Sequence, residues 1–380
     1  MVRDCVMKHS VSVIGITAAL ALTGPMRSAA VSTQERVPNA QQALAPTGGS
    51  GLTAVHGLKV GHYTMPGRPT GCTVVLVEGE GAVGGVSQRG GAPATRELDL
   101  LNPLNMVDRV NGIVLSGGSA FGLESVNGVM RYLEERNIGY KVRTGVVPIV
   151  PAASLIDLSF GGDPKIRPNA ECGYKAAEAA ATGPVGEGNV GAGAGATIGK
   201  MVMGRSMKAG IGSAAIALPD GLVVGAVVAV NAVGDIIDPS SGQTVAGMRT
   251  EDGKALADVR KLLRTGALMR SASAPRAGEA TTIGVVATNA RFSKADVARI
   301  ALMADDGLAR AIVPSHTTGD GDTVFALATG RWTGDVSVTI VGALAAEAMA
   351  EAIVRAATQA QSSNGIPSAR ELGTVPARLK

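Results

Sequence analysis

Two adjacent threonines join a polar segment to an apolar run in the sequence Glu279-Ala280-Thr281-Thr282-Ile283-Gly284-Val285-Val286-Ala287-Thr288-Asn289. The β-branched residues after Thr282 predict a buried strand. If the peptide bond before Thr281 breaks, the new α-amine, whose pKa is about 8, can accept the proton of the Thr281 hydroxyl. A threonine that carries its own terminal amine is one variant of the paired nucleophile and base. The pattern also fits a polar loop that enters a core strand, and Thr-Thr before an apolar run is common.

The segment that leads into this run, Thr265–Ala280, is polar, rich in small residues and without periodicity. Flexible, exposed segments of this kind are where proteolytic processing concentrates. We therefore expect a flexible connection that ends where the proposed nucleophile begins.

The composition predicts a large core built from small apolar residues. Of the 380 residues, 46% are hydrophobic and 17% charged, and there are 52 glycines but only four Phe, four Tyr and one Trp. This core must therefore consist of Val, Ala, Leu and Ile, with glycine at tight turns and close contacts. The net charge of +4 is spread along the chain without a Lys/Arg block, which argues against a nucleic-acid partner.

The N-terminus resembles a secretory signal. Arg3 and Lys8 precede the apolar stretch Val11–Thr23, and Ser28–Ala30 offers small residues for cleavage. We expect a signal peptide over residues 1–30, a flexible linker over 31–50 and export to a bacterial periplasm. The apolar stretch is too short for a stable membrane anchor. A disordered tail or a misplaced start codon is the alternative, and the protein would then be cytoplasmic.

From about residue 51 to the C-terminus, apolar runs alternate with helical patterns, as in one α/β domain. Expected strands are Thr73–Val77, Gly112–Leu115, Leu222–Val230, Ile283–Ala287, Thr323–Ala328 and Val336–Val341. Expected helices are Phe121–Arg136, Ser293–Val313 and Leu344–Ala357. Ser293 and Asp296 form a capping-box pattern at the start of the clearest helix. Cys72 and Cys172 either form one disulfide or remain two buried thiols.

Three glycine-rich clusters could approach an anion closely: Ser116–Gly122, Gly188–Gly195 and Gly210–Ser213. The first follows an expected strand and opens an expected helix, so the backbone around Gly117, Gly118 and Ser119 could bind a carboxylate of a substrate. None has the Lys and Ser/Thr of a nucleotide P-loop. We expect no nucleotide and no other cofactor, and close packing or an active-site wall fits these clusters better.

Polar side chains stand at the ends of two further expected strands. Asp320 and Asp322 lie two residues apart ahead of Thr323–Ala328, and Asn231 follows Leu222–Val230. Paired acids suit proton handling, whereas a metal site is disfavoured because His316 is the only other ligand type nearby. An amide at a strand end can donate to a developing oxyanion. Turns explain each of these residues equally well.

Together these segments resemble the L-aminopeptidase D-Ala-esterase/amidase family, which includes the β-peptidyl aminopeptidases. The resemblance runs from about Gly51 to the C-terminus. It rests on Val60–His62, Arg89–Glu97, Leu115–Leu123, Val230–Asn231, Thr281–Asn289 and Asp320–Gly330, in this order.

The resemblance implies a four-layer αββα sandwich, similar to N-terminal-nucleophile hydrolases but with a distinct topology. Members are made as precursors and split themselves, here into an α chain ending at Ala280 and a β chain of residues 281–380. The matching nucleophile is Thr281, or Thr282 if the register is shifted by one residue. The matching oxyanion donor is Asn231. The family also implies a homotetramer of αβ units.

Two departures from the family pattern bear on the chemistry. Asp320-Gly321-Asp322 stands where β-peptidyl members have Ser-Gly-Glu, which makes Asp322 the better candidate acid and leaves the role of Asp320 open. Ala280 stands where close relatives have Asn, which makes the efficiency of self-cleavage an open question.

The resemblance implies an aminopeptidase or amidase that acts on a small peptide, amide or ester through an acyl-enzyme. An aminopeptidase needs a carboxylate for the substrate ammonium, and Glu124, after the glycine turn, is the residue we name; a solvated helix position is the alternative. A Thr-dependent acyltransferase and a non-catalytic binding protein on the same fold are the competing functions.

Overall fold

The computed structural model of the protein describes residues 51–270 and 280–379. The expected signal peptide and linker lie outside the described residues, as do residues 271–279 of the expected flexible connection. The described residues belong to one compact unit. Among them, no helix is both long and apolar enough to cross a membrane.

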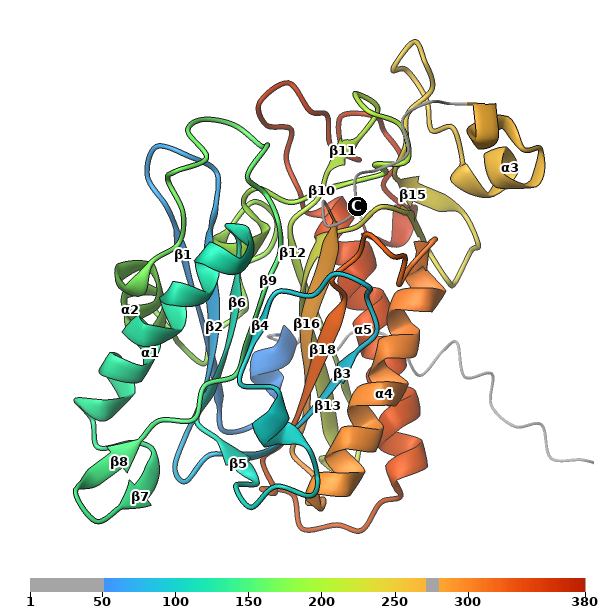
Figure 1. Ribbon diagram of the computed structural model, residues 1–380. Helices are drawn as coiled ribbons and strands as arrows, with labels where there is room; N and C mark the ends of the chain where they lie inside the picture. The colour runs from blue at the N-terminus through green and yellow to red at the C-terminus, as the bar shows by residue number, and fades with distance from the viewer. Residues whose placement is uncertain (1–50, 271–279, 380) are drawn as a thin grey trace, which may run out of the picture. The chain divides into compact units, whose positions relative to one another are not determined.

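The structure contains two main β-sheets and five α-helices within the described ranges (Figure 1). The helices are α1 (Ser125–Glu134), α2 (Ala170–Glu178), α3 (Val259–Arg264), α4 (Lys294–Ala311) and α5 (Val338–Thr358). The first nine strands are β1 (Leu58–Thr64), β2 (Gly71–Val77), β3 (Ala82–Gln88), β4 (Thr95–Arg96), β5 (Arg109–Val110), β6 (Gly112–Ser116), β7 (Tyr140–Val142), β8 (Gly145–Val147) and β9 (Ala152–Ser154). The remaining strands are β10 (Thr197–Ile198), β11 (Met207–Lys208), β12 (Ile211–Ala217), β13 (Val223–Asn231), β14 (Asp235–Ile237), β15 (Thr244–Ala246), β16 (Thr281–Thr288), β17 (Ile312–Val313) and β18 (Thr323–Ala328).

The two main sheets pack face to face between two helical layers. One sheet has the strand order β1-β2-β6-β9-β4, and the other has the order β12-β13-β16-β18-β3-β5. Helix α2 lies against β1 and β2 with α1 beside it, whereas α5 lies against β12 and β13 and α4 against β18 and β3. Figure 1 shows these helices on the outer faces of the two sheets. The architecture is therefore the expected αββα sandwich.

The alternation of side chains along each strand produces three separate cores. On β16, Ile283 and Val285 belong to the core between the two sheets, whereas Val286 belongs to the core under α4 and α5. On β2, Val75 faces the other sheet and Val74 faces α1 and α2. Strands buried on both faces explain why these segments read as continuous Val-rich runs rather than as alternating ones.

Most of the expected elements are confirmed, with one error. The expected strand Val336–Val341 is wrong, because Ser337 caps α5 by accepting a hydrogen bond from the Ile340 backbone N–H, and the apolar run continues into that Ala-rich helix. The expected helix Phe121–Arg136 begins as a 3-10 helix, Ser119–Glu124, before α1. The capping box of Ser293 and Asp296 is present at the start of α4.

A disulfide joins the second strand to the second helix. Cys72 on β2 and Cys172 on α2 are paired, with their Cα atoms 6.3 Å apart, within the usual range for a disulfide. The sequence left open whether these cysteines are paired or free, and in this structure they are paired. The disulfide closes a span of 100 residues. It fixes the outer helical layer to its sheet.

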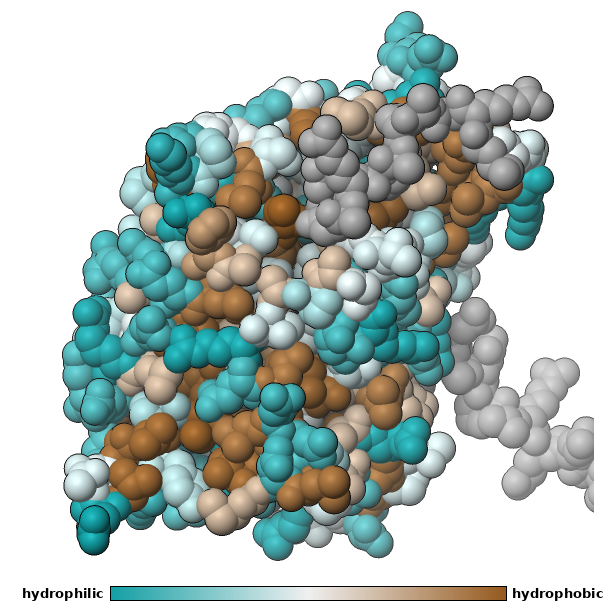
Figure 2. Space-filling view, in the orientation of Figure 1, coloured by the Kyte–Doolittle hydropathy of each residue, from teal (hydrophilic) through white to brown (hydrophobic). Residues whose placement is uncertain are grey.

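One face of the molecule carries scattered apolar side chains (Figure 2). Some of them gather over the β7–β8 hairpin, where Tyr140, Val142 and Val147 are exposed. Apolar atoms make up more than half of a typical protein surface, so these three residues by themselves indicate no function.

Candidate active site

The two threonines at the start of β16 face opposite layers of the sandwich. Thr281 lies on the side of Ile283 and Val285, between the sheets, whereas Thr282 lies on the side of Val286, toward α4 and α5. The Thr281 hydroxyl donates a hydrogen bond to the carbonyl oxygen of Ala280. The Thr282 hydroxyl is buried and has no hydrogen-bond partner among the described residues. The geometry therefore favours Thr281 over Thr282 as the nucleophile.

Asn231 stands directly opposite Thr281 in the sheet. Strand β13 pairs antiparallel with β16, and Asn231 and Thr281 are cross-strand partners whose side chains share the face between the sheets. The Asn231 Oδ1 accepts hydrogen bonds from Thr197 N at 3.0 Å and from Lys200 Nζ at 2.6 Å. Its Nδ2 donates to the carbonyl oxygen of Ile156 at 2.8 Å. A carboxamide nitrogen carries two hydrogens, so a second one can donate to an oxyanion.

Lys200 is a site residue that the sequence analysis missed. Its ammonium group also lies 3.2 Å from the Asn231 carbonyl oxygen. A cation on Oδ1 polarises the carboxamide and strengthens the Nδ2 donor. The glycine cluster Gly188–Gly195 ends five residues before Lys200, but no motif distinguishes this lysine from the other lysines of the chain.

The carbonyl oxygen of Ala280 has a second hydrogen-bond donor, the backbone N–H of Gly321, at 3.1 Å. A Cβ added to Gly321 would lie 2.9 Å from Thr281 Oγ1 and 2.8 Å from the Ala92 carbonyl oxygen. A glycine is therefore required here for space, because any side chain would displace the hydroxyl.

Asp320 and Asp322 are both buried, and they bind different groups. Asp322 Oδ1 accepts from Thr282 N at 2.8 Å, and its Oδ2 accepts from His316 N at 3.0 Å. Asp320 accepts from Thr317 Oγ1 at 2.6 Å and from Val233 N at 3.4 Å. Burial, together with the charge of Asp322, raises the pKa of Asp320. Asp322 thus fixes the first peptide of β16, while Asp320 fixes the loop ahead of β18.

A partly buried histidine, His316, lies beside Asp322, and the buried carboxylate of Asp305 lies beyond it. His316 Nδ1 lies 3.0 Å from Asp322 Oδ2, and His316 Nε2 lies 3.6 Å from Asp305 Oδ1 on α4. Burial alone would lower the pKa of His316, but the two neighbouring carboxylates outweigh it and raise the pKa. Burial raises the pKa of Asp305 to about 6, against a hydrogen bond from Ser87. Asp305 was not predicted as a site residue, although it lies among the apolar residues of the buried face of α4, where a carboxylate is unusual.

The amides of the first glycine cluster already have acceptors inside the protein. Gly118 N donates to Asp157 Oδ1 at 2.9 Å, Gly117 N donates to the Gly71 carbonyl, and the half-buried Ser119 donates its N–H to the Leu155 carbonyl. The anion at this turn is thus Asp157 of the chain itself. The substrate contact expected for Gly117, Gly118 and Ser119 stays a prediction.

Asp157 belongs to a buried hydrogen-bond cluster with Arg68 and Thr70, and the residue before it, Ile156, contacts Asn231. Its carboxylate also accepts from Arg68 Nη2 at 2.7 Å and from Thr70 Oγ1 at 2.6 Å. The preceding residue, Ile156, provides the carbonyl that accepts from Asn231 Nδ2. The first glycine cluster therefore stabilises one side of the Asn231 carboxamide.

Glu124 lies at the end of the 3-10 helix before α1, and its side chain is exposed. Among the described residues it takes part in none of the ion pairs. Its expected contact with a substrate ammonium stays a prediction. In the same described ranges, no three His, Cys, Asp or Glu side chains gather as a metal ion would require.

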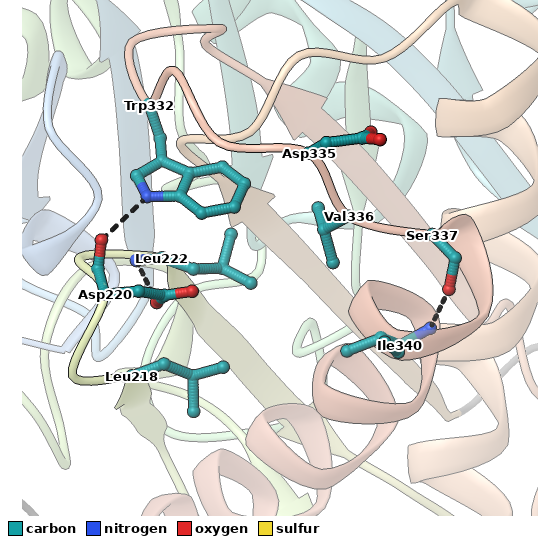
Figure 3. Close-up of a pocket in the computed structure, with 8 residues that line it drawn as sticks. All are labelled: Leu218, Asp220, Leu222, Trp332, Asp335, Val336, Ser337 and Ile340. Carbon is teal, nitrogen blue, oxygen red and sulfur yellow. Dashed lines mark hydrogen bonds between the residues drawn. The ribbon is translucent and has the colours of Figure 1, made fainter.

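A surface hollow of about 570 Å³ lies away from Thr281. Figure 3 shows its lining, in which the Trp332 indole N–H donates to the Asp220 carbonyl at 3.0 Å. The hollow lies beside the start of β13, where Val224 pairs with Thr288, seven positions along β16 from Thr281 and hence roughly 23 Å away. It is lined by Leu218, Asp220, Leu222, Trp332, Asp335, Val336, Ser337 and Ile340. It therefore takes no part in the site at Thr281.

Comparison with known proteins identifies the family of this chain. The family model described as peptidase family S58 matches residues 50–370. An uncharacterized aminopeptidase of Mycobacterium leprae is 44% identical over 345 residues, which cover 83% of this chain and 92% of the relative. A 6-aminohexanoate-oligomer endohydrolase of Kocuria sp. is 32% identical over 312 residues, 79% of this chain and 84% of the relative.

The fold has solved counterparts as well. The L-aminopeptidase D-Ala-esterase/amidase of Ochrobactrum anthropi, described as a prototype of the serine aminopeptidases with a variant of the N-terminal-nucleophile hydrolase fold, superimposes with a TM-score of 0.62. The match covers 87% of this chain and 93% of that chain at 20% identity, which speaks to the fold alone. The family model, the identity to the mycobacterial relative and the sandwich agree with one another, and the chain therefore belongs to peptidase family S58, a family of hydrolytic enzymes.

Proposed function

We propose that this peptidase is a self-processing N-terminal-threonine hydrolase that breaks its own Ala280–Thr281 bond. The observation that carries the proposal is the contact between the Thr281 hydroxyl and the Ala280 carbonyl, whose oxygen also accepts the Gly321 N–H. The hydroxyl oxygen attacks the carbonyl carbon and the C–N bond breaks, so the acyl group moves from nitrogen to oxygen. Water then hydrolyses the ester and leaves a carboxylate on Ala280 and an amine on Thr281.

In the mature enzyme the Thr281 amine serves as the base for its own hydroxyl. The hydroxyl attacks the substrate carbonyl, an acyl-enzyme forms as the amine or alcohol departs, and water releases the acid. Asn231 Nδ2 and the Gly321 N–H, once free of the Ala280 carbonyl, would bind the oxyanion. A single well-placed donor of this kind contributes about 3–4 kcal/mol to the transition state.

The two aspartates and Lys200 support these groups rather than attack the substrate. Asp322 holds the Thr282 N–H and thereby fixes the backbone that carries the nucleophile. Asp320 holds the loop that presents the Gly321 N–H. Lys200 polarises the Asn231 carboxamide. These contacts favour a role for Asp320 and Asp322 in positioning the backbone around Thr281 and Gly321.

For the substrate we propose a small peptide, amide or ester with a free N-terminal amine, because the Mycobacterium leprae relative, 44% identical, is named an aminopeptidase. This chemistry requires no cofactor. A second candidate is the internal hydrolysis of amide oligomers, since the Kocuria relative is named an oligomer endohydrolase. An N-acetylated amide separates the two: an aminopeptidase rejects it, whereas an endohydrolase cleaves it.

The larger organisation of the protein is also a proposal. We propose that residues 1–30 direct export to the periplasm, that 31–50 form a linker, and that the α chain ending at Ala280 and the β chain 281–380 remain together in one domain. A homotetramer of such αβ units follows from the family resemblance.

Intact-mass analysis and N-terminal sequencing of the purified protein test this proposal. We expect two chains, one of which begins at Thr281, and we expect Thr281→Ala to give a single, inactive chain. Thr281→Ser, which keeps the hydroxyl, should still split. A wild-type protein that is active as one continuous chain through position 281 would refute the mechanism. A wild-type protein that is both unsplit and inactive would instead indicate a non-catalytic function.

Hydrolysis must also be separated from acyl transfer. Incubation with an amino-acid amide and a competing amine should give mainly the free acid. Transfer product in excess of acid would instead identify the protein as a Thr-dependent acyltransferase.

A further inference from the structure

Lys208, at the end of β11, is a fully buried lysine whose ammonium group binds neither Thr281 nor Asn231 in the described structure. Its side chain has an exposed fraction of 0%. The ammonium group donates to three backbone carbonyls, Gly193 at 3.1 Å, Ala196 at 2.9 Å and Ala209. All three hydrogens of the ammonium are thus used by the backbone, and no carboxylate is among these acceptors.

One of these acceptors belongs to the peptide that fixes Asn231. The carbonyl of Ala196 and the N–H of Thr197 are the two ends of one planar peptide unit, so the orientation of one sets that of the other. The Ala196 carbonyl accepts from Lys208 Nζ, and the Thr197 N–H donates to Asn231 Oδ1 at 3.0 Å. Strand pairing reinforces the link, because Thr197 and Lys208 are partners in the β10–β11 ladder.

The charge of Lys208 is costly where it lies. Burial lowers its pKa to about 7, the carboxylate of Asp157 opposes this shift, and the ammonium of Lys200 adds to it. A buried ammonium is unfavourable unless its hydrogen bonds are needed, and an apolar side chain of the same length would fill this space without that cost. The cation also polarises the 196–197 peptide and makes its N–H a stronger donor.

We propose that Lys208 is a positioning residue for catalysis, which orients the 196–197 peptide so that its N–H holds the Asn231 carboxamide with Nδ2 directed at the oxyanion. The inference rests on the proposed function, in which Asn231 is the oxyanion donor. The Asn231 carboxamide is then fixed at both ends. Lys208 acts on Oδ1 through the Thr197 N–H, and the Asp157 hydrogen-bond cluster acts on Nδ2 through the Ile156 carbonyl.

The chain offers a matched control for the test. Lys294, the first residue of α4, is also largely buried, and its Nζ donates to the carbonyls of Leu100, Asn105 and Val107, each at 2.8 Å. It follows the end of β16, at the opposite end of that strand from Thr281. Loss of its ammonium should therefore affect stability without moving the site.

The experiment compares wild type, Lys208→Met, Lys208→Arg and Lys294→Met by kcat and KM on an amino-acid amide, per mole of split protein, and by urea unfolding. We expect Lys208→Met to lower kcat roughly 10- to 100-fold, as a misplaced catalytic group does, with KM within about twofold of wild type. Lys208→Arg should recover part of the loss. Lys294→Met should lower stability but leave kcat within about twofold. A Lys208→Met protein that accumulates as precursor while Lys294→Met splits normally would support the same role.

Two results would overturn the proposal: a wild-type kcat for Lys208→Met, or an equal loss of kcat in Lys294→Met. If Lys208→Met is insoluble, Lys208→Gln, which can donate to fewer carbonyls, takes its place under the same two criteria. Failure of the proposed function is recognised separately, because it would leave the wild type unsplit or Asn231→Ala fully active.

Discussion

The backbone N–H of Gly321 donates a hydrogen bond to the carbonyl oxygen of Ala280 at 3.1 Å, and a Cβ at Gly321 would lie 2.9 Å from the Thr281 hydroxyl oxygen. Gly321, on the loop ahead of β18, thus has two roles. Its N–H binds the carbonyl of the peptide bond that we propose is cut, and its lack of a side chain leaves space for the attacking oxygen. Neither property depends on a side chain.

Gly321→Ala should therefore abolish or strongly slow self-cleavage. The new methyl group would collide with Thr281 Oγ1 and with the Ala92 carbonyl, and displacement of one oxyanion donor alone slows such reactions about 100- to 1,000-fold. Gly183→Ala is the control, because a Cβ there meets nothing within 4 Å. Denaturing gels over time after synthesis provide the measurement. Normal splitting of Gly321→Ala would remove this glycine from the mechanism.

Thr282→Val should leave both cleavage and activity intact. The Thr282 hydroxyl is buried without a hydrogen-bond partner in the described structure, so its replacement by a methyl group of similar size should be neutral or stabilising by about 1 kcal/mol. Gel analysis, amidase assays and urea unfolding check this prediction. An unsplit Thr282→Val protein would show that the nucleophile is one residue later than we propose.

Asp305 should make stability depend on pH between about 4 and 6. Burial raises its pKa from the ordinary 3.8 to about 6, so the folded protein binds a proton in this range that the unfolded chain has released. Its contribution therefore favours folding at low pH and is lost as the pH rises through the folded pKa, by up to about 3 kcal/mol.

Urea unfolding of wild type and Asp305→Asn from pH 4 to 8 measures this contribution as a difference. The free energy of unfolding of wild type should fall relative to Asp305→Asn as the pH rises. Asp306→Asn is the control, since Asp306 is exposed and, within the described ranges, forms an ion pair only with Arg89. A constant difference across the range would contradict the raised pKa of Asp305.

The Cys72–Cys172 disulfide should stabilise the domain by about 2–4 kcal/mol, because it closes a span of 100 residues in the unfolded chain. Unfolding with and without a reductant measures this difference. The Cys72→Ala/Cys172→Ala double variant should show the lower stability in both conditions. A wild-type protein that is indifferent to the reductant would indicate free thiols.

The sequence predicted the elements better than the contacts between them. Continuous apolar runs located β13, β16 and β18 to within one or two residues, because strands buried on both faces carry few polar side chains. The same logic failed at Val336–Val341, where β-branched residues lie in the first turn of α5 after a serine cap. Local propensity was there overridden by the cap and by packing on the sheet.

The sequence by itself determined which groups this protein can use: a hydroxyl ahead of a buried strand, an amide at the end of another, and two carboxylates beside a glycine. The tertiary structure alone decided that Asn231 stands opposite Thr281, and that the Gly321 N–H joins the Thr281 hydroxyl at the Ala280 carbonyl. It also decided that Lys200 donates to the Asn231 side-chain oxygen, and that Lys208 binds the carbonyl of the peptide whose N–H donates to the same oxygen. Register between strands is fixed by the packing of whole faces, and backbone donors leave no mark on residue identity, so neither can be read from the chain.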